Sequence, residues 1–260
     1  MDKLRVALLQ NDVVWEDVHA NLAQCEEILS SLDAEVNLVV LPEMFTTGFS
    51  MSATQYAEEN DGTTLVTLRR WAHDFDIALA GSFIAREDGK CYNRGFFIKP
   101  DGETHFYDKR HLFRMGDEGR AFAAGDKRLI VEYRGWRIAL FICYDLRFPV
   151  WSRNVDNEYD MALYVASWPQ VRSHVWRTLL LARAIENACY VCGVNRVGVD
   201  GAGLTYTGDT MAIDFKGAVV ADLPQGEQGV AVVDLDGDKL QSFRTKFPTW
   251  RDADSFHINI

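Results

Sequence analysis

The chain has 260 residues, 48% of them hydrophobic and 25% charged, and it carries a net charge of −11 at pH 7. This composition is typical of a folded globular protein and excludes a disordered one, and the acidic balance excludes a nucleic-acid partner, which would require a basic face. The length suits one large α/β domain and no Ser- or Pro-rich linker divides the sequence, so we expect residues 1–260 to form a single domain.

Strand-like and helical patterns alternate along the chain, which predicts a mixed α/β fold. The β-α-β order of the first half implies parallel strands with helices on a sheet face, and similar blocks in the second half are compatible with a two-sheet sandwich. Apolar spacing predicts helices over residues 17–32, 63–74 and 176–187. The expected strands cover residues 4–10, 36–41, 77–83, 91–98, 129–133, 136–142, 161–166, 190–195, 209–215, 217–222 and 229–235.

The sequence patterns also bear on location and on cysteine chemistry. The apolar run at residues 4–9 is too short for an export signal and contains Arg5, and no stretch reaches the roughly 18 apolar residues of a spanning helix. Five cysteines, an odd number, are typical of reduced thiols, so we expect a cytoplasmic protein with no membrane partner. Cys189 and Cys192 lie in a strand-like run, where side chains three apart face opposite sides, so we expect core cysteines rather than a redox or metal pair.

Three segments place reactive side chains where predicted strands end, which is where ligand sites gather in α/β sheets. Glu43 follows the strand at 36–41, Cys143 follows the strand at 136–142 and precedes a turn, and Lys109 lies in a basic loop. The N–H groups of a helix start would lower the pKa of the Cys143 thiol, and a lysine would stabilise developing negative charge. Each residue alone has an ordinary alternative: a solvated glutamate, a buried structural cysteine and a solvated basic turn.

In order along the chain, these segments resemble those of the nitrilase superfamily of carbon–nitrogen hydrolases, and the resemblance covers essentially the whole chain. It rests on residues 41–43 (Leu-Pro-Glu), 108–113 (Asp-Lys-Arg-His-Leu-Phe), 143–149 (Cys-Tyr-Asp-Leu-Arg-Phe-Pro), 183–187 (Arg-Ala-Ile-Glu-Asn) and 206–210 (Tyr-Thr-Gly-Asp-Thr). Residues 42–50, 109–113 and 166–169 resemble the omega-amidase branch in particular. The resemblance implies a four-layer α-β-β-α sandwich, a homodimer, and no metal or organic cofactor.

The resemblance also implies a reaction. Omega-amidases release ammonia from the distal amide of small dicarboxylic monoamides, typically 2-oxoglutaramate or 2-oxosuccinamate. In that reaction Glu43 would act as general base and then acid, Cys143 would attack the amide carbon to form a thioester, and water would hydrolyse the thioester. Lys109 and the backbone N–H of Tyr144 would hold the oxyanion.

Further residues complete the site that the resemblance implies. Glu118 would position Lys109 or the substrate, and the adjacent Asp117 is the alternative for that role. Trp168 would form a wall of the pocket. The acidic substrate requires a cation, and Arg147 resembles the residue that pairs with the substrate carboxylate in this branch.

The assignment of the carboxylate-binding residue and of the reaction has alternatives. Arg147 would instead form a structural ion pair with Asp145 or Glu186, and Arg172 is a weaker candidate for the substrate carboxylate. The same catalytic residues would serve a nitrile, another aliphatic amide or an N-carbamoyl substrate, and the fold would also serve an idle interaction protein. A metallohydrolase ranks last, because the six histidines are dispersed without metal-binding spacing.

Overall fold

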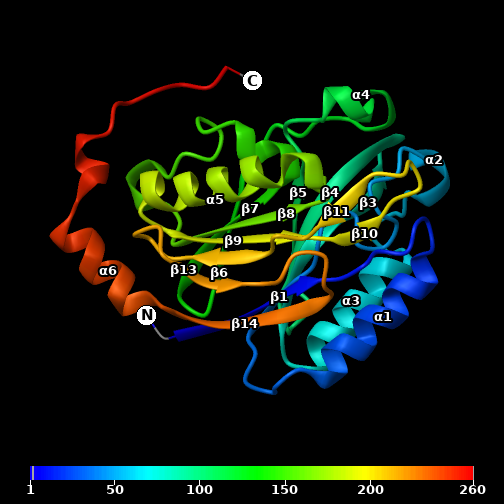
Figure 1. The fold of residues 1–260 in the computed structure, drawn as a ribbon, viewed down its shortest axis with the longest axis horizontal. Helices are drawn as coiled ribbons and strands as arrows, with labels where there is room; N and C mark the ends of the chain where they lie inside the picture. The colour runs from blue at the N-terminus through cyan, green and yellow to red at the C-terminus, as the bar shows by residue number, and fades with distance from the viewer. Residues whose placement is uncertain (2, 260) are drawn as a thin grey trace.

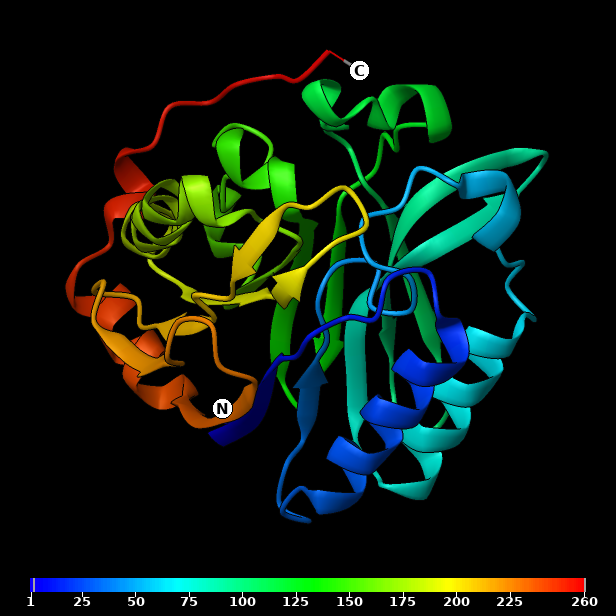
Figure 2. The same ribbon diagram turned by 45° about the vertical axis from the view of Figure 1, so that its right-hand side comes forward.

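The computed structural model describes residue 1 and residues 3–259 of the chain. Two six-stranded sheets face one another, and helices cover the outer face of each, so the layers follow the order α-β-β-α (Figure 1). Figure 2 shows the two helical layers on opposite sides of the paired sheets. The fold expected from the resemblance is thereby confirmed.

The first sheet combines strands from the N-terminal half with the last strand of the chain. Its order is β14-β1-β2-β3-β4-β5, in which β1, β2 and β3 run parallel and the remaining neighbours pair antiparallel. Two helices, α1 (Val18–Ser31) and α3 (Thr63–Asp74), pack on its outer face. The strands are β1 (Lys3–Gln10), β2 (Leu38–Val40), β3 (Ala78–Glu87), β4 (Lys90–Ile98), β5 (Thr104–Asp108) and β14 (Gly229–Asp236).

Alternation of side chains along β1 explains how both faces of this sheet are buried. Leu4 and Leu8 belong to the core between the two sheets, whereas Ala7 and Leu9 belong to the core under α1 and α3. Successive strand residues point to opposite faces, and both faces are covered, so the strand is apolar almost throughout rather than alternating with polar residues.

The second sheet repeats this plan with a parallel centre of β7, β8 and β9. Its order is β13-β12-β9-β8-β7-β6, and α5 (Ser173–Asn187) covers its outer face. All residues of β8 and β9 are buried, as expected for parallel strands that are covered on both sides. The strands are β6 (Leu129–Tyr133), β7 (Trp136–Ile142), β8 (Met161–Ala166), β9 (Tyr190–Asn195), β12 (Met211–Ile213) and β13 (Val219–Asp222).

Short elements surround the sheets, and most were not predicted. They are α2 (Ala53–Tyr56), α4 (Glu118–Ala121), α6 (Gly237–Lys246), the hairpin β10 (Val197–Val199) with β11 (Thr205–Thr207), and 3-10 turns at Arg114–Gly116, Cys143–Arg147, Val155–Asn157, Gln170–Arg172 and Thr249–Asp252. The helix α6 buries few apolar residues and so lacks a helical apolar pattern. Within the described part of the chain, no helix has the length and apolar character to cross a membrane.

The boundaries of the longer elements follow the apolar patterns. The helix α3 and the strands β6, β7, β8 and β9 span the predicted ranges, whereas β2 is shorter than predicted and β3 is longer. The extension of β3 has a physical cause, because its whole length pairs with β4 in a long hairpin that ends at Glu87 and Lys90. The segments after β2, β5 and β7 carry the three reactive residues singled out from the sequence.

Candidate active site

Lys109, Glu43 and Glu118 form a buried ionic cluster. The Lys109 Nζ donates a hydrogen bond of 2.8 Å to Glu43 Oε1, and bonds of 3.0 and 2.9 Å to Glu118 Oε1 and Oε2. All three side chains are fully buried. The alternatives of a solvated glutamate and a solvated basic turn are therefore wrong. Asp117, the alternative to Glu118, points outward and pairs with Arg120 on the surface.

Asn93 joins this cluster, and sequence reasoning missed it. Its Nδ2 donates to Glu43 Oε1 at 2.7 Å and to Glu118 Oε1 at 3.0 Å, and its Oδ1 accepts from the hydroxyl of Ser82 at 3.0 Å. Asn93 therefore holds the two carboxylates on either side of Lys109 in fixed positions. The available signal was a polar amide inside the strand at 91–98, because asparagine is depleted in strands.

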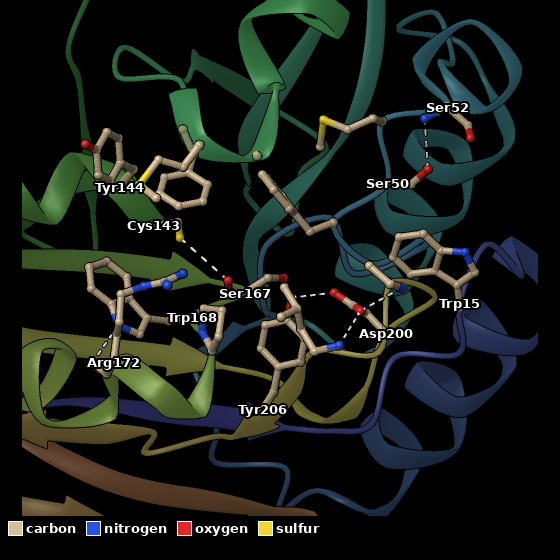
Figure 3. A pocket seen from close by; sticks show the side chains of 18 of the residues that line it. Trp15, Ser50, Ser52, Cys143, Tyr144, Ser167, Trp168, Arg172, Asp200 and Tyr206 are labelled. Atoms are coloured by element: carbon tan, nitrogen blue, oxygen red, sulfur yellow. Dashed lines mark hydrogen bonds between the residues drawn. The ribbon is translucent and has the colours of Figure 1, made fainter.

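Cys143 lies at a tight turn where β7 ends and a 3-10 helix begins. Its φ of +46° is in the left-handed region, which a non-glycine residue adopts only where the surrounding structure holds it. The Sγ lies 3.9 Å from the carbonyl oxygen of Ser167, and Figure 3 shows the thiol directed toward that residue. The backbone N–H of Ser167 donates to Glu43 Oε2 at 2.8 Å, so the backbone of Ser167 contacts both the Cys143 thiol and the Glu43 carboxylate.

Burial sets the protonation of this site. Burial, reinforced by the nearby Glu43 carboxylate, raises the pKa of the Cys143 thiol well above its usual value, although Lys109 opposes the shift. The pKa is therefore raised rather than lowered as expected from the turn, and desolvation is the largest cause. Burial opposes the charge of Lys109, but Glu118 and Glu43 outweigh it and raise the pKa of Lys109. Burial also raises the pKa of Glu118.

Asp145 ties the turn of Cys143 to the loop of Lys109. Its Oδ2 accepts from the backbone N–H of Ile142 at 3.0 Å and from the hydroxyl of Tyr107 at 2.7 Å. Its Oδ1 accepts from the backbone N–H of His111 at 3.0 Å and lies 2.8 Å from His111 Nδ1. One buried carboxylate thus bridges residues on either side of Lys109 and the residue before Cys143. Sequence reasoning considered Asp145 only as a partner for an arginine.

The thiol opens onto a cavity of about 500 Å³. The predicted pocket residues Tyr144, Arg147 and Trp168 line it, and so does Arg172. The remaining lining residues are Trp15, Glu16, Phe49, Ser50, Met51, Ser52, Phe113, Met115, Gly116, Ser167, Pro169, Asp200, Ala202, Leu204 and Tyr206. Glu43, Lys109 and Glu118 are fully buried and are not among the lining residues.

The structure excludes the alternative in which Arg147 forms a structural ion pair. Asp145 is occupied by the contacts described above, and Glu186 pairs with Arg183 at 2.8 Å. The Arg147 guanidinium instead lies over the indole of Trp168, with Cζ 5.0 Å from the ring centroid. Its N–H groups thus remain available to the cavity.

The cysteines and the metal-binding potential complete the description. Cys189 and Cys192 are free and fully buried, as predicted for core cysteines. In the described residues, no group of three or more His, Cys, Asp or Glu side chains is arranged to hold a metal ion.

Comparison with known proteins places this arrangement in a family. The sequence profile of the family described as carbon-nitrogen hydrolase matches residues 5–245. Omega-amidase YafV of Escherichia coli is 45% identical over 99% of this chain and 100% of its own, and 2-oxoglutaramate amidase of Bacillus subtilis is 29% identical over 96% and 97%. The crystal structure of a CN-hydrolase superfamily protein from Xanthomonas campestris, with an arsenic adduct in its active site, is 42% identical, covers 100% of both chains and gives a TM-score of 0.97. The chain belongs to the carbon–nitrogen hydrolase family.

Proposed function

We propose that this protein is an omega-amidase, a cysteine-dependent amidohydrolase that releases ammonia from the distal amide of a small dicarboxylic monoamide. The observation that carries the proposal is the combination of a thiol backed by a buried Glu-Lys-Glu cluster with an unpaired arginine in the same cavity. The names of the Escherichia coli and Bacillus subtilis relatives, an omega-amidase and a 2-oxoglutaramate amidase, support it.

In the acylation step, Cys143 is the nucleophile and Glu43 the general base. Because burial raises the pKa of Cys143, the resting thiol is protonated, and its proton moves to Glu43 as sulfur bonds to the amide carbon. Glu43 then gives this proton to the amide nitrogen. The C–N bond breaks, ammonia leaves, and the acyl group remains on sulfur as a thioester.

Lys109 and the backbone N–H of Tyr144 stabilise the oxyanion of the tetrahedral intermediate. The raised pKa of Lys109 keeps its ammonium charged, so it serves as a fixed positive charge rather than as a proton donor. Glu118 and Asn93 are positioning residues, since they hold the ammonium and the Glu43 carboxylate in place. Removing one oxyanion donor of this kind typically costs about 10²–10³ in rate.

The second step uses the same base. Water loses a proton to Glu43 and attacks the thioester carbon, the C–S bond breaks, and the proton returns from Glu43 to the sulfur. The products are the dicarboxylic acid and the free thiol, so the residues are restored without a metal or an organic cofactor.

Substrate choice separates the omega-amidase from its alternatives in the same family. The carboxylate of the acyl group binds Arg147, and Trp168 forms the wall behind that guanidinium. The experiment measures ammonia release from 2-oxoglutaramate, with a nitrile and an N-carbamoyl amino acid as parallel substrates. Turnover of the amide alone supports the proposal, and preferential turnover of either other substrate contradicts it.

A second measurement tests the nucleophile and the idle-protein alternative together. Cys143→Ala abolishes turnover, because it removes the thiol, and keeps the far-ultraviolet circular dichroism spectrum of the wild type. Cys91→Ala, at a half-buried cysteine on β4 outside the ionic cluster, is the matched control and keeps its activity. Equal activity of the Cys143→Ala variant would place the nucleophile elsewhere. A wild type inactive on all three substrates would favour the idle protein.

We also propose that residues 1–260 fold as one domain, that the protein is a cytoplasmic homodimer, and that its only small partners are the amide and water. The exposed apolar side chains of Ile185 on α5 and of Val171 just before it support a dimer contact at this helix, and five free cysteines support a reducing compartment. Light scattering of the purified chain, one cooperative unfolding transition and cell fractionation test these three statements.

A further inference from the structure

Two arginines line the cavity, and both lack a carboxylate partner among residue 1 and residues 3–259. Arg147 lies over Trp168, and the Cζ of Arg172 lies 5.4 Å from the ring centroid of Phe113. Neither guanidinium makes a hydrogen bond or an ion pair to the described residues. A guanidinium that stacks on a ring by its face keeps its N–H donors at its edge, where a planar anion is bound.

The buried arginines of this protein are held differently. Each of the four most buried arginines forms an ion pair with a carboxylate, at distances of 2.7 to 2.9 Å. These pairs are Arg94 with Asp108, Arg183 with Glu186, Arg196 with Asp12 and Arg244 with Asp160. A chain with a net charge of −11 supplies carboxylates in excess, so two unpaired guanidiniums in one cavity indicate that the anion comes from a ligand.

The carboxylates that line the cavity do not serve these arginines. Asp200 accepts from the hydroxyl of Tyr206 at 2.7 Å and from two backbone N–H groups, and Glu16 accepts from Ser50 and Tyr56. Figure 3 shows Asp200 on the opposite side of Ser167 from Arg172. The cavity therefore has a positive end, formed by Arg147 and Arg172, while the carboxylates of Asp200 and Glu16 already accept hydrogen bonds from other groups of the protein.

Trp168 contacts both arginines. Its ring face carries Arg147, and its Nε1 donates to the backbone carbonyl of Arg172 at 2.9 Å. The buried indole thus contacts the guanidinium of Arg147 and the backbone of Arg172, and Phe113 contacts the guanidinium of Arg172.

We propose that Arg172 binds the anionic end of the acyl group together with Arg147, so that the two guanidiniums share one substrate carboxylate. This inference rests on the proposed function and deepens it. Arg172 becomes the residue that makes the pocket select anionic acyl groups over neutral amides of equal length. If both guanidiniums bind the substrate carboxylate, neither can be paired with an aspartate or glutamate of the protein. This explains why each arginine contacts an aromatic ring instead.

The kinetic test compares an anionic with a neutral substrate. Arg172→Gln raises KM for 2-oxoglutaramate by about 10- to 100-fold, the usual worth of a charge-assisted hydrogen bond, and affects kcat far less; butyramide, the neutral comparison substrate, shows no matching rise in KM. Arg172→Lys gives a smaller rise, since it keeps the charge and loses the fork. Arg70→Gln removes an exposed arginine on α3 and is the matched control.

A binding test keeps this inference separate from the proposed activity. Titration of the Cys143→Ala protein with 2-oxoglutarate gives a dissociation constant, and the added Arg172→Gln change weakens it by the same about 10- to 100-fold. Unchanged binding overturns the inference, as does an equal loss of butyramide turnover in Arg172→Gln. If the wild type hydrolyses no acidic amide but 2-oxoglutarate binding still depends on Arg172, the proposed function fails and the anion site stands.

Discussion

The bridging carboxylate of Asp145 gives the sharpest test of how the site is held together. Asp145→Asn keeps the shape of the side chain but replaces one oxygen by an NH₂ group. Whichever way the amide turns, its NH₂ group faces a backbone N–H donor, that of Ile142 or that of His111, and that hydrogen bond is lost. A hydrogen bond to a charged group contributes about 1.5–3 kcal/mol, so the free energy of unfolding falls by at least about that amount.

The change also acts on the reaction, because Asp145 joins the turn of Cys143 to the loop of Lys109. Misplacement of a catalytic group by about 1 Å costs about 10²-fold in rate, so kcat falls far more than KM rises. Urea unfolding gives the stability and ammonia release gives the two kinetic constants. Asp74→Asn, at an exposed carboxylate on α3, is the control and changes stability by less than about 0.5 kcal/mol. A loss below about 1 kcal/mol in Asp145→Asn, with kcat retained, would refute the reasoning.

Three further changes probe the buried groups. Lys109→Met leaves Glu43 and Glu118 facing each other without a cation, so unfolding in urea shows a loss of about 3–5 kcal/mol and turnover disappears. Asn93→Ala removes one donor from each carboxylate, which lowers the free energy of unfolding by about 1–3 kcal/mol and lowers kcat, and retained kcat would contradict a positioning role. The free energy of unfolding decreases as the pH rises above 9, the usual pKa of a thiol. Burial raises the pKa of the buried cysteines, so above this pH the unfolded chain releases thiol protons that the folded chain keeps. Each such thiol contributes about 1.4 kcal/mol per pH unit to that decline, and the Cys143→Ala protein declines less steeply.

The sequence predicted the strand ends and the three reactive residues, because apolar runs and the residues that follow them are local features. The partners of Glu43 are not local, since Asn93, Lys109 and Ser167 lie 50, 66 and 124 residues away along the chain. No pattern around residue 43 indicates that the carboxylate is fully buried. Burial emerges only when the two sheets pack together.

The expectation for the Cys143 pKa and one alternative for Arg147 fail for the same reason. A lowered pKa for Cys143 followed from the turn alone and omitted desolvation, which depends on the whole fold. The alternative of an ion pair of Arg147 with Asp145 or Glu186 is wrong because the 3-10 turn directs Arg147 to Trp168 and Asp145 to His111, and Glu186 pairs with Arg183. Short-range arguments singled out candidate residues and could not give their surroundings.

The pairing of β1 with β14 has a consequence for biosynthesis. Leu4 pairs with Leu235, so β1 leaves the ribosome long before the strand that closes its free edge. Until β14 pairs with it, this edge of β1 has unpaired backbone N–H and C=O groups, which can pair with strands of other chains and cause aggregation. A nascent chain arrested before residue 229 therefore has an open sheet, and its dependence on chaperones should end abruptly once residues 229–236 emerge.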